Sequence, residues 1–207
     1  MADIIPPITR PKLLLATYNK GKIREFRSLL SGIPYEILSL SDCGITQEVE
    51  ENGETYEQNA ILKATSMASI SCLLSLADDS GLEVDALGGE PGIRSARYAG
   101  ANKTDADRIA FLLEKLKGSP DIHRTAQFRC VIAIAVPNGK VELFSGTCPG
   151  IITTEPRGTN GHGYDPVFFI PELGKTMAQL TMPEKNKVSH RARAAMKAKE
   201  YLINLAG

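Results

Sequence analysis

Two groups of acidic side chains stand out in this chain, because carboxylates placed this way can bind a divalent cation or accept a proton. In the first, Asp78 and Asp79 directly follow the largely apolar residues 73–77, which are predicted to form a strand. Ser80-Gly81 comes next and is typical of a turn. Adjacent acids at the end of a buried strand are hard to explain by packing, and open α/β sheets bind ligands at such strand ends. The alternative is a simple Asp/Ser/Gly turn without a function.

The second acidic group lies in residues 42–58, a stretch that contains no Lys or Arg. Its glutamates are Glu48, Glu50, Glu51, Glu54 and Glu57. Clustered carboxylates repel one another unless a cation neutralises them. Proteins bind Mg²⁺ with one or two carboxylates, completed by water and substrate phosphates. The alternative is a solvated acidic loop leading into a helix start, where the helix dipole favours acids.

Two basic segments have the opposite character and suit an anion. Residues 16–22 join a predicted strand to a predicted helix and contain Lys20 and Lys22, so backbone N–H groups and ammonium groups could meet a phosphate there. The segment is not a P-loop, because the G-x-x-x-x-G-K-[ST] pattern is absent. Further along, Ser189-His190-Arg191 begins another predicted helix, where cations oppose the dipole unless an anion lies among them. The alternative in both places is a set of solvated surface residues.

A glycine-rich segment, residues 158–165, completes the polar stretches. Its glycines allow the backbone to approach a flat ligand closely. Tyr164 offers an aromatic face for stacking, and Asp165 offers an acceptor for base or ribose groups. Carboxylates, a basic clamp and this segment together fit a nucleotide-polyphosphate site that uses a metal ion.

The elements that must position these residues alternate along the chain. Strands are predicted at residues 13–16, 35–40, 73–77, 128–136, 140–147 and 166–170. Helices are predicted at 21–30, 55–69, 104–116 and 189–205, with Thr55, Thr104 and Ser189 as caps. This order predicts a single α/β domain over residues 1–207, with a mixed sheet flanked by helices and prolines that extend residues 1–11 as an arm. Three long loops, 41–54, 81–103 and 146–165, are expected to carry function.

Composition narrows the class of partner. The chain has 207 residues, with 24 Lys+Arg and 24 Asp+Glu, so its formal net charge is zero. Nucleic-acid coats and polybasic membrane binders work through a summed positive field, so neither is expected as a partner class. The N-terminus lacks the apolar core of a signal peptide, and no apolar run approaches ~18 residues. We therefore expect a cytoplasmic protein with a small anionic ligand.

Five stretches, in order along the chain, closely resemble the inosine triphosphate pyrophosphatase family, the non-canonical purine nucleoside triphosphate pyrophosphatases. They are LLLATYNKGKIREF, ENGETYEQNAILKA, LADDSGLEVDALGGEPGIRSARYAG, GTNGHGYDPVFF and EKNKVSHRARA. The resemblance covers residues 13–194. It implies Mg²⁺-dependent hydrolysis of dITP, ITP and XTP to the monophosphate and pyrophosphate. It also implies an elongated mixed sheet in two lobes with the site in a central cleft, and a homodimer.

The same resemblance assigns roles to residues. Asp79 would be the general base, and Glu50 and Asp79 would hold the metal. The substrate-binding residues would be Thr17, Tyr18, Asn19, Lys20, Gly21, Lys22, Lys63, Ser80, His162, Gly163, Tyr164, Asp165, Lys185, His190 and Arg191. Many relatives have Phe where this chain has His162, so an imidazole would replace an aromatic contact to the base.

Two other functions remain as alternatives at this stage. One is a Maf-like pyrophosphatase for modified nucleotides, which a substrate panel would separate. The other is a non-catalytic nucleotide-binding protein, which would need a lost catalytic carboxylate, whereas Asp78, Asp79 and Glu50 are all present.

Overall fold

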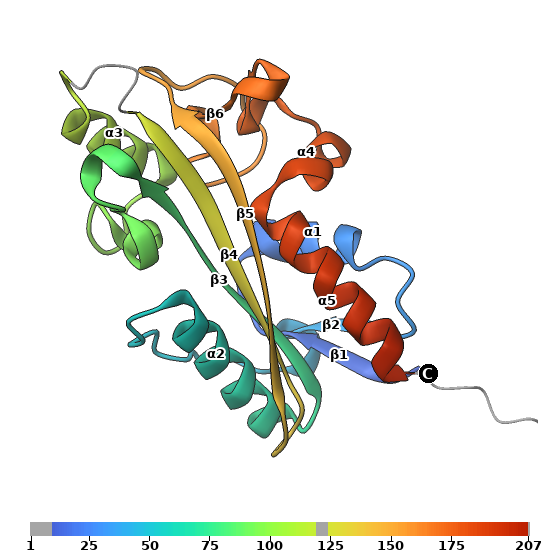
Figure 1. Ribbon diagram of the computed structural model, residues 1–207. Helices are drawn as coiled ribbons and strands as arrows, with labels where there is room; N and C mark the ends of the chain where they lie inside the picture. Colours follow the sequence, from blue (N-terminus) through green and yellow to red (C-terminus); the bar gives the residue numbers. More distant parts are fainter. Residues whose placement is uncertain (1–9, 119–123, 207) are drawn as a thin grey trace, which may run out of the picture.

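A seven-stranded mixed sheet with helices on both faces forms the framework of the computed structural model, which describes residues 10–118 and 124–206 (Figure 1). The strands are β1 (Lys12–Leu15), β2 (Glu36–Ser39), β3 (Leu74–Val84), β4 (Thr125–Ala135), β5 (Val141–Ile152), β6 (Phe168–Ile170) and β7 (Lys175–Thr176). The helices are α1 (Lys20–Leu29), α2 (Tyr56–Ser71), α3 (Asp105–Lys115), α4 (Met182–Val188) and α5 (His190–Ala206). The predicted α/β class with a mixed sheet is confirmed. The predicted arm falls almost wholly outside the described residues.

Strand order in the sheet is β2-β1-β3-β4-β5-β6-β7. β1 pairs in parallel with both β2 and β3, and all later pairs are antiparallel. The long central strands β3, β4 and β5 run the length of the molecule and give it an elongated shape (Figure 1).

Three apolar clusters hold the helices on the sheet. One lies between the sheet and α2, where small side chains such as Ala60 and Ala64 pack on Leu14 and Ala77. A second lies on the opposite face, under α1 and α5. The third surrounds α3 at the far end of β3 and β4. Successive strand residues point to opposite faces, so β3 contributes Leu76 to one face and Ala77 to the other.

The sequence prediction for β3 was wrong. Instead of ending before Asp78 in an Asp-Ser-Gly turn, β3 continues through these residues to Val84. Its pairing with β4 is unbroken from Ser75↔Ala135 to Val84↔Ala126. Up to Ala77, both faces of the strand are covered by apolar clusters. Beyond Ala77 the strand forms the wall of a pocket, so its side chains become polar while its backbone hydrogen bonds to β4 continue.

Two predicted loops are likewise more regular than expected. β5 extends to Ile152, so the first part of residues 146–165 is strand. Residues 81–103 begin as strand and contain the 3₁₀ helix η3 (Gly92–Arg97). Gly81 allows this helix to pack closely on β3, because a Cβ there would lie 2.3 Å from the Gly92 carbonyl oxygen.

The predicted helix caps are present. Thr55 accepts from the Gln58 amide, Thr104 and Asp107 form a reciprocal capping box, and the Ser189 hydroxyl accepts from the Ala192 amide. Within the described residues, no helix has the length and apolar character needed to cross a membrane.

Candidate active site

A pocket of about 410 Å³ opens where β1 stops and β3 continues. The pairing of the two strands ends at Leu15↔Leu76, so β1 does not continue along β3 beyond that point. Side chains from two apolar clusters meet around the pocket: Leu40 and Met67 come from the α2 side, and Leu82 and Phe128 from the α3 end. The pocket therefore lies between two parts of the molecule with separate cores.

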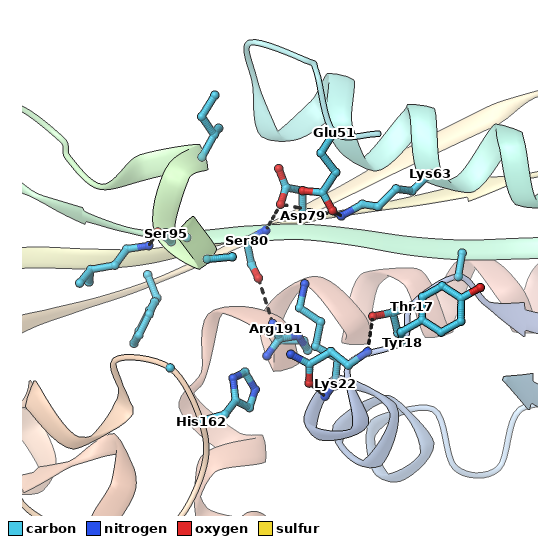
Figure 2. A pocket seen from close by; sticks show the side chains of 18 of the residues that line it. Thr17, Tyr18, Lys22, Glu51, Lys63, Asp79, Ser80, Ser95, His162 and Arg191 are labelled. Atoms are coloured by element: carbon cyan, nitrogen blue, oxygen red, sulfur yellow. Dashed lines mark hydrogen bonds and ion pairs between the residues drawn. The ribbon is translucent and has the colours of Figure 1, made fainter. Parts of the chain in front are cut away.

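Asp79 is the centre of an acidic group on the α2 side of β3 (Figure 2). Its Oδ2 accepts a hydrogen bond of 3.0 Å from the Asn59 side chain of α2, and its Oδ1 accepts from the Ser80 amide at 2.9 Å. The Asn59 carboxamide is itself oriented, because its oxygen accepts from the Gly53 amide at 2.8 Å. The carboxylate therefore has a fixed orientation at the pocket wall.

Lys63 lies between two carboxylates of this group. Its Nζ is 2.8 Å from Glu51 Oε1 and 3.9 Å from Asp79 Oδ1. Burial by itself would lower the pKa of Lys63. The nearby carboxylates of Asp78, Asp79 and Glu51 outweigh burial, so the pKa is raised above its ordinary value. The pKa of Asp79 is raised by burial and by Glu51, against the opposing effect of Lys63. Asp79 is therefore a better proton acceptor than an ordinary aspartate.

On the other side of β3, Asp78 is buried among cations. Its Oδ2 lies 3.0 Å from Lys22 Nζ and 3.2 Å from Arg191 Nη2. Burial would raise its pKa, but Lys22, Arg191 and Lys63 hold that pKa well below the usual value. Arg191 also donates to the Ser80 hydroxyl at 3.0 Å. Asp78 thus fixes two basic side chains that line the pocket.

Glu25 of α1 connects Arg191 to a second buried cation. It pairs with the Arg191 guanidinium and lies 2.7 Å from Lys185 Nζ, while Lys185 also lies 2.6 Å from Asp165 Oδ2. His162 Nε2 is 3.4 Å from Glu25 Oε1. Burial would raise the pKa of Glu25, but Arg191, His162 and Lys185 hold it far below its usual value.

His190 is an uncharged member of the pocket lining. Its ring stacks on Phe128 at 4.7 Å between centroids. Burial, Arg191 and Lys185 lower its pKa well below the ordinary value. The Ser189-His190-Arg191 cluster is therefore buried and not solvated. Arg191 is its charged member, and Asp78 and Glu25 supply the counter-charges.

The segment before α1 supplies a mixed set of groups. The Asn19 side chain accepts from the Gly21 and Lys22 amides, so these helix N-terminal donors already have a protein partner. Tyr18 donates to the carbonyl oxygens of Ile45 and Gln47 and so anchors the acidic loop. Lys22 is the segment's basic group at the pocket.

Most of the residues predicted for the site line this one pocket. They are Thr17, Tyr18, Asn19, Lys22, Lys63, Asp79, Ser80, His162, Gly163, Tyr164, Asp165, Lys185, His190 and Arg191. Lys20, Gly21 and Glu50 do not line it. Gly21 lies beneath the His162 ring, and Glu50 and Lys20 are exposed. The acidic stretch and the basic C-terminal stretch do meet, through Glu48 and Glu51 on one side and Lys185 and Arg191 on the other.

Sequence reasoning did not single out Asn59, Glu25, Asp105 or Arg108. Asp105 and Arg108 line the pocket from α3, while Glu25 and Asn59 support it from behind. A weak signal existed for Glu25, because it follows Lys22 by three residues on one helix face. The same spacing is equally typical of a solvated helix surface, so it could not show burial.

Comparisons with known proteins place this chain among its relatives. A model of the Ham1 family matches residues 13–201. The dITP/XTP pyrophosphatase of Geobacter sulfurreducens is 52% identical over 191 residues, covering 92% of this chain and 96% of the relative. That of Desulforamulus reducens is 51% identical over 194 residues, covering 94% and 96%. The solved structure of the Staphylococcus aureus Ham1 protein matches with a TM-score of 0.83 and 43% identity, covering 94% of this chain and 99% of that one.

The family match spans every segment that lines the pocket, from Ala16 to Arg191. The resemblance noted from the sequence motifs is confirmed, and this chain belongs to the Ham1 family.

Proposed function

We propose that this protein hydrolyses non-canonical purine nucleoside triphosphates, dITP, ITP and XTP, to the monophosphate and pyrophosphate. The observation that carries the proposal is a single pocket with an oriented carboxylate, Asp79, at one side and buried cations, Lys185 and Arg191, at the other. The names of the relatives, dITP/XTP pyrophosphatases at about half identity over nearly the whole chain, support this substrate class over the Maf-like alternative.

Two carboxylates at the pocket fit a divalent cation. Glu51 and Asp79 both face the Lys63 ammonium, so the protein already holds a positive charge between them. Mg²⁺ prefers such oxygen ligands and takes its remaining ligands from water and phosphate. We infer that Glu51 and Asp79 would hold Mg²⁺, with Glu50, the ligand expected from the resemblance, as the alternative to test. The ion would neutralise phosphate charge and activate a water.

Asp79 would accept the proton of the attacking water. Asn59 and the Ser80 amide orient its carboxylate, and its raised pKa favours proton acceptance. The water attacks the α-phosphorus, the bond between that phosphorus and the α,β-bridging oxygen breaks, and pyrophosphate leaves. Lys63 and Lys22 both line the pocket and would stabilise the charge that develops on the phosphate oxygens.

Lys185 would contact the base. Two of its three N–H donors point to Glu25 and Asp165, which leaves one for a ligand. The 6-oxo group of hypoxanthine or xanthine accepts such a donor, whereas the 6-amino group of adenine would leave it unpaired. His162, Gly163 and Tyr164 form the neighbouring wall. From the motif resemblance we also infer a homodimer, which light scattering of the purified protein would test.

A pyrophosphate-release assay tests this function. With excess Mg²⁺, we expect dITP and XTP to be hydrolysed at least ~10-fold faster than dATP, because the 6-amino group of adenine leaves a buried donor unpaired at a cost of ~1–3 kcal/mol. Guanine shares the 6-oxo group, so any preference over dGTP has to come from its 2-amino group. Asp79→Asn should reduce kcat by ~10²–10⁴-fold while nucleotide still binds in equilibrium dialysis. Equal rates on all four nucleotides would reject the substrate class. Nucleotide binding without hydrolysis by the wild type would instead support a non-catalytic protein.

A further inference from the structure

Two aspartates in the first turn of α3 have different surroundings. Asp107 is exposed and caps its own helix through Thr104. Asp105 is half-buried and lines the pocket, and its carboxylate contacts a segment far away in the sequence. Neither the motifs nor the helix cap requires an acid at position 105.

Asp105 Oδ2 accepts a hydrogen bond of 2.6 Å from the backbone amide of Gly163, in the glycine-rich segment. Its other oxygen pairs with Arg108, one turn further along α3. Arg108 donates in turn to the carbonyl oxygens of Ala96 and Lys103. The carboxylate is therefore held in place from α3 and η3 while it holds the amide of Gly163.

The position of Gly163 determines where its neighbours lie. Gly163 has φ +65°, a backbone conformation that few other residues adopt. The adjacent His162 amide donates to Asp165 Oδ2 at 2.9 Å, and the Tyr164 hydroxyl donates to the Ser95 carbonyl oxygen at 2.9 Å. Of these three hydrogen bonds, the one from the Gly163 amide to Asp105 connects the middle of the glycine-rich segment to α3.

We propose that Asp105 is a positioning residue, which holds the glycine-rich segment in the geometry that accepts the nucleotide. The inference rests on the proposed function of this pocket. Without the carboxylate the segment would occupy other conformations, and the apparent dissociation constant rises as the fraction of competent protein falls. Asp79 and its partners lie on β3 and α2 and do not depend on this bond, so the chemical step should be preserved.

Steady-state kinetics with dITP and excess Mg²⁺ would compare three variants. Asp105→Ala should raise KM on the order of tenfold, with kcat within about twofold of wild type, because a charge-assisted hydrogen bond is lost. Asp105→Asn keeps an oxygen acceptor for the Gly163 amide, so its KM should lie closer to wild type than to Asp105→Ala. Asp107→Ala is the matched control: it removes the Asp107 half of the capping box with Thr104 and should lower Tm, and its KM should be unchanged.

Hydrogen exchange of the nucleotide-free proteins supplies a readout independent of activity. Asp105→Ala should speed exchange in a peptide containing residues 158–165, and Asp107→Ala should not. The proposal is overturned by unchanged exchange in Asp105→Ala, by equal KM effects of the two alanine variants, or by equal KM values for Asp105→Asn and Asp105→Ala. If the wild type hydrolysed no nucleotide, the proposed function would fail, while the exchange experiment would still test the contact.

Discussion

Glu50 and Glu51 are neighbours in the sequence, but their carboxylates have different surroundings. Glu51 lies 2.8 Å from Lys63 and lines the pocket beside Asp79. Glu50 is exposed and outside the pocket lining. A cation bound by Asp79 is therefore in reach of the Glu51 carboxylate, which makes the pair a matched test of metal binding.

Glu51→Gln should raise the Mg²⁺ concentration needed for half-maximal activity by at least ~10-fold, because one of two charged ligands is lost. Glu50→Gln removes the same charge one residue away and should leave the titration unchanged. The measurement is initial rate against Mg²⁺ at saturating dITP. If only Glu50→Gln shifted the curve, the ligand implied by the motif resemblance would be correct and Glu51 would not be a ligand.

The sequence predicts the chemical types in the site better than it predicts single positions. Carboxylates near Asp79 and cations near Arg191 were both expected. The choice between Glu50 and Glu51 depends on which one faces Lys63 when the acidic loop folds, and Tyr18 and Asn59 fix that loop through backbone groups. Such contacts leave no periodic pattern in a sequence.

Among the elements, α1 does more than connect two strands. Its first turn presents Lys22 to the pocket, and one turn later Glu25 holds Lys185 and Arg191 from helices α4 and α5. A buried ion pair adds little net stability when complete, but removal of one member leaves an uncompensated buried charge. Glu25 faces two cations, so its loss should be costly.

Glu25→Gln should reduce the free energy of unfolding by about 3 kcal/mol, because two buried cations lose their shared counter-charge. Urea unfolding followed by circular dichroism measures the change. Glu36→Gln, at the exposed first residue of β2, removes the same charge and should stay within about 0.5 kcal/mol of wild type. A loss below 1 kcal/mol in Glu25→Gln would show that Arg191 and Lys185 find other partners.

Secondary structure was predictable where apolar side chains recur with the period of a helix or strand that packs on a core. It was not predictable elsewhere. The helix of α3 has apolar residues at helical spacing and a capping box, and both were visible in the sequence. The second half of β3 has Asp78, Asp79, Ser80 and Gly81, which resemble a turn when read alone. They remain in a strand because β4 pairs with their backbone, from Asp78↔Ile132 to Gly81↔Arg129, and these partners are far apart in the sequence.

Over the whole molecule, the zero net charge results from opposite charges brought together from distant segments. Asp78, Glu25 and Asp165 pair with Lys22, Lys185 and Arg191 inside the protein. His190 is buried among the same groups and is kept neutral by burial and by the nearby cations, against Glu25 and Asp78. The stability of the molecule should therefore depend on pH in a range set by His190.

Well above pH 6.5, His190 is neutral in both the folded and the unfolded chain, so stability is independent of its titration. As the pH falls below that value, the unfolded chain binds a proton that the folded protein does not, and the free energy of unfolding should fall by up to ~1.4 kcal/mol per pH unit. Urea unfolding between pH 8 and pH 5 measures the slope. His190→Gln cannot titrate, so its curve should be flatter by that amount even if the variant is less stable overall. Parallel curves for the two proteins would mean that His190 takes up its proton over the same pH range in the folded and the unfolded chain, so that Glu25 and Asp78 balance its burial and the nearby cations.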